Sequence, residues 1–97
     1  MYWRSLRGVS RAHYGLACVE LLNGGSIPSV KEHFLHAREI IDGLSSRYPD
    51  AVPLRWELSR FAFLSTLEND QPRSAWIEAF DCYKFHLVLA PPIGYKN

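Results

Sequence analysis

The chain has 97 residues, of which 47% are hydrophobic and 13% aromatic, and its formal net charge is +1. This length fits one domain, and an apolar fraction of this size argues against intrinsic disorder. No apolar run approaches the roughly 20 residues that span a bilayer, and the N-terminus lacks the apolar core of a secretion signal. We therefore expect a cytoplasmic protein with one helical domain over residues 1–89, an extended tail over 90–97 and no membrane contact.

The first predicted helix covers residues 3–22. Apolar side chains recur there at intervals of three or four residues, so they gather on one side at about 100° per residue. The segment ends at Asn23, Gly24 and Gly25, which are typical helix-stopping residues. The apolar positions of this helix include Trp3, Leu6, Tyr14, Ala17 and Leu21.

The second predicted helix begins with Ser29-Val30-Lys31-Glu32, which matches a capping box. In this motif the serine hydroxyl and the glutamate carboxylate each accept a hydrogen bond from a free backbone N–H. The helix is expected to end near Arg47, because the residue before Pro49 disfavours helical backbone. Its apolar stripe consists of Val30, Phe34, Ala37, Ile41 and Leu44.

Two further helices are predicted in the second half of the chain. Asp50 is the expected cap of the third helix, Pro53 suits its first turn, and the helix runs to about Glu68. Asp70 is the expected cap of the fourth helix, which covers about residues 72–89. No strand-like alternation of useful length occurs. The sequence therefore predicts an all-α fold of four antiparallel helices, arranged as a small bundle or as two stacked helical hairpins.

The third predicted helix is apolar on two opposite sides. Its core side carries Leu54, Leu58 and Phe61. Its second side carries Trp56, Phe63 and Leu67. Either the helix is central in the bundle or the second side docks a partner, since a four-helix domain offers few ways to bury both sides of one helix. The residues of the second side are therefore candidates for partner binding, together with Phe85, which lies opposite the core stripe of the fourth helix.

The spacing of large and small side chains in the first two helices resembles that of tetratricopeptide repeats. The pattern is Tyr14-x2-Ala17-Cys18-x2-Leu21, followed by Val30-x3-Phe34-x2-Ala37. Small residues recur where paired helices must approach closely, and a shift of 45 residues superposes Ala17 on Ala62. This resemblance implies a solenoid-type stack of two helical hairpins.

A second resemblance is to the flagellar export chaperones that bind flagellin. It is carried by residues 37–46, with the sequence Ala-Arg-Glu-Ile-Ile-Asp-Gly-Leu-Ser-Ser. It continues in the aromatic-rich segment Phe61-Ala62-Phe63-Leu64, which leads to Asn69-Asp70. The two pieces together span roughly half of the chain. This resemblance implies a chaperone that masks an apolar helix of its partner.

The sequence contains no recognisable catalytic, metal-binding or cofactor-binding signature. His33 and His36 lie with flanking glutamates within two turns of one helix, but a zinc site needs further ligands at a matching spacing. A solvated polar helix face is the simpler interpretation. Cys18 and Cys82 lie far apart in the chain, and we expect two reduced core cysteines rather than one disulfide. We expect neither a metal nor a cofactor.

Arg7 and His13 are spaced as in the R-x(4–6)-H pattern of HEPN-type ribonucleases, which are small and all-helical. This resemblance implies an enzyme in which the arginine stabilises a phosphate and the histidine positions a 2′-hydroxyl. The pair lies in the first helix, earlier in the chain than the family's motif. Most carboxylates have a basic neighbour about one helical turn away, and Glu57 is accordingly expected to pair with Arg60.

Positive charge is concentrated at the start of the chain. Residues 1–13 contain Arg4, Arg7 and Arg11 but no acid, and the first carboxylate belongs to Glu20. The three arginines recur every three to four residues and form one ridge along the first helix. Such a ridge is either a solvated face or a contact for an acidic protein or for nucleic-acid phosphates. The near-neutral total charge argues against nucleic acid as the main partner.

These features predict a small protein-interaction module, either an adaptor or a chaperone-like protein. The module docks a partner helix or a second copy of itself through Trp56, Phe63 and Leu67. The arginine ridge supplies orientation and association rate. The alternatives are a small nucleic-acid-associated regulator that uses the ridge and, last, a HEPN-like ribonuclease.

Overall fold

The computed structural model describes residues 3–82, which form four helices and no strand. The first helix, α1 (Trp3–Leu22), has the predicted bounds. The helix is followed by Gly24, whose φ of 84° is a left-handed conformation that favours glycine. The next N–H, of Gly25, is donated to the Glu20 carbonyl at 2.7 Å and satisfies one carbonyl of the last turn. The predicted glycine stop is therefore confirmed.

The second helix, α2 (Ile27–Arg47), ends where predicted but begins before the predicted capping box. Its cap is Ser26, whose Oγ accepts a hydrogen bond from the Ser29 N–H at 3.2 Å. The predicted cap, Ser29, instead lies inside the first turn. Pro28 explains the difference, because a proline in a first turn needs no N–H partner and its fixed φ suits a helix start.

The third helix, α3 (Val52–Leu64), has Pro53 in its first turn as predicted. Its cap position is Ala51, which has an extended backbone and forms no side-chain capping hydrogen bond. The predicted cap, Asp50, precedes the cap position by one residue and does not cap the helix. The proline at the first turn removes one of the N–H groups that an aspartate would otherwise satisfy.

The end of α3 comes before the predicted position near Glu68. The Ser65 hydroxyl donates to the Phe61 carbonyl at 2.8 Å, and the Thr66 hydroxyl donates to the Phe63 carbonyl at 2.7 Å. These side chains occupy carbonyls at the C-terminus of the helix. The chain then leaves the helix in a turn, so the predicted last turn is absent.

The fourth helix, α4 (Arg73–Phe80), is much shorter than the predicted 72–89. It begins after Pro72 rather than after Asp70, and no side chain caps it. It ends at Asp81, whose φ of 57° and ψ of 45° place it in the left-handed region. Aspartate tolerates this conformation better than most residues do. The prediction of a continuous helix through this position is wrong, and the predicted tail lies outside the described residues.

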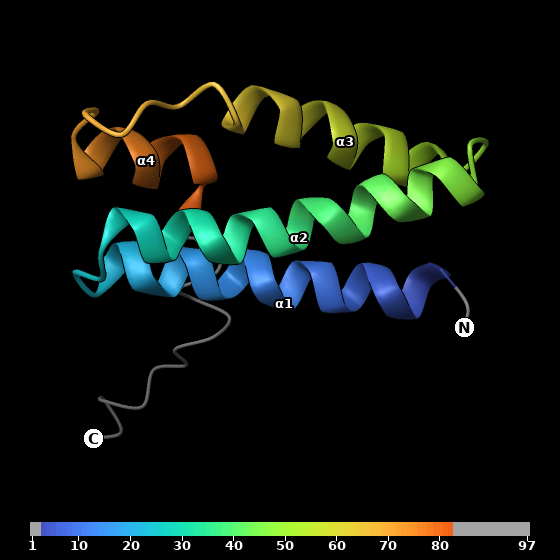
Figure 1. Cartoon of the computed structure of the whole chain (residues 1–97), viewed down its shortest axis with the longest axis horizontal. Coiled ribbons are helices and arrows are strands. Elements are labelled where there is room, and N and C mark those ends of the chain that lie inside the picture. Colours follow the sequence, from blue (N-terminus) through green and yellow to red (C-terminus); the bar gives the residue numbers. More distant parts are fainter. Residues whose placement is uncertain (1–2, 83–97) are drawn as a thin grey trace, which may run out of the picture.

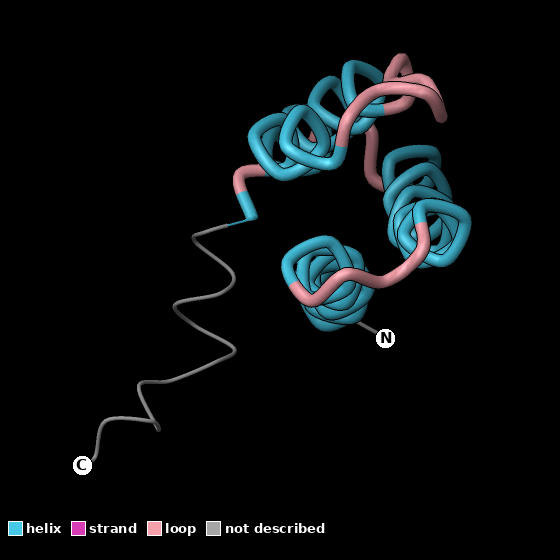
Figure 2. The backbone as a smooth tube through the Cα atoms, turned by 90° about the vertical axis from the view of Figure 1, so that its left-hand side faces the viewer, coloured by secondary structure: helices cyan, strands magenta, loops and turns pink. Residues whose placement is uncertain are grey.

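The helices follow one another along an arc when the molecule is viewed end-on (Figure 2). α1 and α2 lie side by side over their lengths, and α3 packs against α2 (Figure 1). α4 packs against α1, which brings the last described helix back to the first. The predicted all-α fold is confirmed.

One aromatic side chain from each helix lies at the centre of the arc. The Tyr14 ring centroid is 5.2 Å from that of Phe80 and 5.8 Å from that of Phe61. The Phe34 centroid is 5.3 Å from Phe61 and 5.5 Å from Phe80. Tilted and edge-on ring pairs of this kind add to the stabilisation that burial provides. We call these four residues the ring cluster.

Small side chains allow α1 and α2 to approach closely. Ala17 and Ala37 are completely buried between the helices. The Ser10 hydroxyl is also buried and donates to the Ala37 carbonyl at 2.8 Å. The apolar stripe predicted for α2 is buried throughout. Periodicity therefore identified the inner side of this hairpin correctly.

Two phenylalanines test which side of α3 stabilises the fold. Phe61 is 4% exposed, whereas Phe63 is 61% exposed. We expect Phe61→Ala to lower the free energy of unfolding by about 3–5 kcal/mol, because it leaves a cavity among packed rings. Phe63→Ala removes the same atoms from a solvated position and should change it by less than about 0.5 kcal/mol. Urea denaturation measures both values, and equal losses would contradict the orientation of α3.

Candidate functional site

The outer side of α3 carries exposed apolar residues. Leu54 and Phe61 are buried on the inner side, whereas Trp56 is 76% exposed, Phe63 61% and Val52 48%. The three exposed residues lie within about 40° of one another around the helix axis. We call Val52, Trp56 and Phe63 the α3 strip. The sequence allows either a central helix that is buried on both sides or a helix with one exposed apolar side, and α3 is the second kind.

Leu67 does not belong to this strip, although the sequence analysis placed it there. α3 ends at Leu64, so the helical register does not extend to Leu67. Its side chain is partly buried and packs against the core beyond the helix end. Phe85, the other candidate contact, lies outside the described residues. The candidate partner-binding residues that the structure brings together are therefore Trp56 and Phe63.

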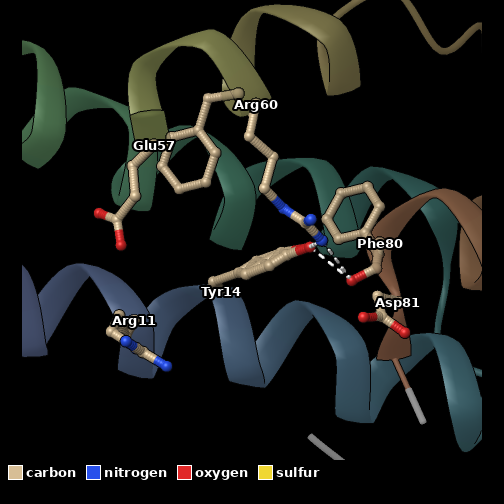
Figure 3. Close-up of a pocket in the computed structure, with 7 residues that line it drawn as sticks. Arg11, Tyr14, Glu57, Arg60, Phe80 and Asp81 are labelled. Atoms are coloured by element: carbon tan, nitrogen blue, oxygen red, sulfur yellow. Dashed lines mark hydrogen bonds between the residues drawn. The ribbon is translucent and has the colours of Figure 1, made fainter. Parts of the chain in front are cut away.

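Two adjoining hollows lie between α1 and α3, and both are lined by Glu57 and Arg60. Figure 3 shows the smaller hollow, with Glu57 and Arg60 extending from α3 toward α1. The smaller hollow, of about 180 Å³, is lined by Arg11, Tyr14, Glu57, Arg60, Phe61, Phe80 and Asp81. The larger and more open hollow, of about 730 Å³, is lined by Arg7, Val52, Pro53, Trp56, Glu57 and Arg60. The larger hollow is therefore continuous with the α3 strip.

Three helices are joined by hydrogen bonds at one end of the smaller hollow. The Tyr14 hydroxyl donates to the Phe80 carbonyl at 2.5 Å (Figure 3). The Arg60 Nη2 donates to the Tyr14 hydroxyl oxygen at 2.6 Å and to the same carbonyl at 3.0 Å. The guanidinium also lies 5.5 Å from the Tyr14 ring centroid. We call this arrangement the Phe80 clamp.

Burial keeps the hydroxyl of Tyr14 protonated within the clamp. Burial raises the pKa of Tyr14 above its usual value, although the hydrogen bond and positive charge of Arg60 act in the opposite direction. A protonated hydroxyl can donate to the Phe80 carbonyl, whereas a phenolate cannot. The role of Tyr14 in this hollow is therefore structural.

The arginine ridge of α1 is partly used inside the fold. The Arg7 Nε lies 2.9 Å from Glu57 Oε2, in an ion pair that joins α1 to α3. The helical spacing predicts that Glu57 pairs with Arg60, and this prediction is wrong. Arg60 is instead held in the clamp. The Arg4 guanidinium lies 5.3 Å from the Trp3 ring centroid. Arg11 is exposed at the edge of the smaller hollow.

The ribonuclease-like pair contacts two different helices. Arg7 reaches Glu57 on α3, whereas the His13 ring packs edge-on at 5.3 Å from the ring of His36 on α2. These positions do not converge on a common point within the chain. Among residues 3–82, no group of three or more His, Cys, Asp and Glu side chains is placed to hold a metal ion.

The two cysteines lie in the core, one in α1 and the other just after α4. Cys18 and Cys82 are both buried free thiols. A hydrogen bond with Cys82 and burial raise the pKa of the Cys18 thiol. Because the thiolate is the reactive form of cysteine, this environment makes Cys18 a poor nucleophile.

No protein-family model, curated protein or solved structure matches this chain. None of the helices in the described part of the chain is both long and apolar enough to cross a membrane. The strip and the adjoining hollows combine exposed apolar side chains, a concavity and charge, and the strip contains the two most exposed large apolar side chains of residues 3–82, Trp56 and Phe63.

Sequence reasoning missed two parts of this site. Val52 precedes Trp56 by one helical turn, and that spacing was a usable signal once the helix start was known. The Phe80 clamp had no local signal, because Tyr14 and Arg60 are 46 residues apart and their shared acceptor is a backbone carbonyl. Hydrogen bonds of this kind become visible only when the helices are packed.

The folded state is expected to lose stability as the pH rises above about 10. Because burial raises the pKa of Tyr14 above its ordinary value of 10.0, the unfolded chain releases this proton at a pH where the folded chain retains it. The stabilisation is therefore complete at lower pH and falls by up to about 1.4 kcal/mol for each further pH unit. Urea denaturation at about pH 8 and about pH 11 measures the loss.

Tyr14→Phe is the control for this measurement. The variant lacks the titrating proton, so its stability should fall less steeply with pH. At neutral pH it should be about 1–2 kcal/mol less stable, because the Phe80 carbonyl loses a donor. The Cys18 thiol, whose pKa is also raised, contributes to both proteins and cancels in the comparison. Identical slopes would show that the Tyr14 hydroxyl is not held protonated by the fold.

Proposed function

We propose that this chain is a protein-interaction module, an adaptor or chaperone-like protein, that docks a partner helix or a second copy of itself on the α3 strip. The observation that carries this proposal is the 76% exposure of Trp56. An indole on a solvated helix face keeps a large apolar area in contact with water, and burial of that area stabilises a complex. Exposed aromatic anchors of this type supply much of the binding free energy at protein interfaces.

The way α3 is held supports this proposal. Its inner side is anchored by the buried Leu54, Phe61 and Leu64, and the strip projects from the opposite side. A partner therefore meets side chains on a formed helix, and the entropy cost of ordering a loop does not arise. The adjoining larger hollow offers space for a partner side chain next to Trp56.

The resemblances to helical-hairpin repeats and to export chaperones agree with this proposal. Both imply successive helices, and residues 3–82 form four of them in an arc (Figure 2). A chaperone-like role consists in covering an apolar helix of a partner, which is the contact that the strip would make. Nucleic acid is less well supported as a partner, because Arg7 of the ridge is engaged with Glu57.

A photo-crosslinking side chain at position 63 tests the proposal in the cells that make the protein. Phe63 is 61% exposed on the strip, and Leu35 on α2 is 51% exposed and provides a matched apolar control position. We expect one discrete covalent product from position 63 and none from position 35. The mass of the product distinguishes a second copy from a different protein.

Trp56→Glu should abolish the crosslinked product without unfolding the chain. Because Trp56 is largely exposed, the substitution should change the free energy of unfolding by less than about 0.5 kcal/mol. Urea denaturation of the purified variant checks this value. The proposal fails if position 63 yields no product, or if the product persists after Trp56→Glu.

A further inference from the structure

The charges that border the α3 strip indicate the chemistry of its partner. Arg55 and Arg60 are both exposed and lie on opposite sides of the strip around the helix axis. α3 contains one acid, Glu57, and its carboxylate is paired with Arg7. The exposed apolar residues are therefore flanked by positive charge on both sides.

Positive charge near the strip is not neutralised by the Phe80 clamp. The hydrogen bonds of Arg60 go to the Tyr14 hydroxyl and the Phe80 carbonyl, which are both uncharged. Arg11 is also exposed, but it lines only the smaller hollow and not the one beside Trp56. Asp81, an acid, lines that same smaller hollow, so Arg55 and Arg60 are the cations that border the strip itself.

We propose that the partner of the α3 strip is an amphipathic helix of another protein with acidic residues on both flanks of its apolar side. This inference rests on the proposed docking function. The apolar side of the partner covers Trp56 and Phe63, and its carboxylates approach Arg55 and Arg60 on the two flanks of the strip. The opposite charges raise the association rate and select the partner, while the buried aromatic side chains supply affinity.

A second copy of the chain fits this surface less well. A symmetric dimer through the strip brings the same patch of both subunits together. Arg55 and Arg60 would then lie beside the corresponding arginines of the second copy, and like charges at an interface oppose binding. The strip extends over about three helical turns, so a partner helix of similar length suffices to cover it.

Two designed peptides test the proposal on the intact chain. Each has about 18 residues, enough to form a helix, with leucine at the i, i+4 and i+11 spacing of the strip. One carries glutamate on both flanks and the other carries lysine at the same positions. Fluorescence anisotropy of labelled peptide is measured at about 50 mM and about 200 mM salt.

We expect the acidic peptide to bind at least about tenfold more tightly than the basic peptide at the lower salt concentration. The ratio should fall at the higher concentration, because salt screens exposed charges. Arg55→Glu, a charge reversal at one flank of the strip, should reduce the preference to about threefold or less. Lys31→Glu, a charge reversal on α2, is the control and should leave the preference unchanged. Arg60 is not substituted, because it also holds the clamp.

The outcomes separate this inference from the proposed function. If both peptides bind equally and Trp56→Glu abolishes both, the acidic partner is wrong and the docking strip stands. A homodimer as the crosslinked product from position 63 likewise overturns the acidic partner and leaves the docking strip in place. If a single-stranded oligonucleotide displaces the acidic peptide, the arginines serve nucleic acid and the inference is wrong. If neither peptide binds and position 63 yields no crosslink, both proposals fail.

Discussion

Hydrogen bonds to the carbonyl of Phe80 hold three of the helices, α1, α3 and α4, together. This carbonyl accepts hydrogen bonds from Tyr14 of α1 and Arg60 of α3, and it ends α4. α4 has only eight residues, and an isolated helix of that length is not stable in water. Its stability must come from tertiary contacts, which include this clamp and the burial of Trp76 and Phe80. They also include the hydrogen bonds of Arg73 to the Leu21 and Gly25 carbonyls. The left-handed backbone at Asp81 ends the helix at the clamped carbonyl.

The clamp also determines which side of α3 faces solvent. Arg60 and Phe61 are adjacent in the sequence, and one contacts the clamp while the other enters the ring cluster. Fixing these two side chains fixes the rotation of the helix about its axis. Residues 56 and 63 must then point outward, because they lie roughly opposite Phe61 around the helix. The exposure of Trp56 is therefore a consequence of interactions made on the inner side of the same helix.

Much of the fold was predictable from local patterns, and the errors have local physical causes. The bounds of α1, the end of α2 and the inner apolar stripes follow from periodicity and from glycine and proline positions. The cap at Ser26 and the early end of α3 depend on competition between alternative hydrogen bonds, which a pattern does not rank. Helical spacing placed Trp56 and Phe63 together on a second apolar side of the helix, but whether that side is buried or exposed depends on how the helices pack. Leu67 was misplaced because the helix that would carry it ends first.

The interactions that the sequence did not predict connect residues far apart in the chain. One of them, the hydrogen bonding of Arg60, affects both the position of α4 and the charge of the surface. Arg60 holds α4 through uncharged acceptors, so its positive charge remains effective at the hollow beside Trp56. An acidic acceptor in the clamp would hold α4 equally well, since charged hydrogen bonds are strong, but would cancel that charge. Arg7 shows this other case, because its bond to Glu57 joins α1 to α3 and removes its charge from the ridge. The charge of the acceptor therefore determines the electrostatic role of each arginine. An arginine paired with a carboxylate only stabilises the fold, whereas one bonded to uncharged acceptors also adds positive potential around the strip.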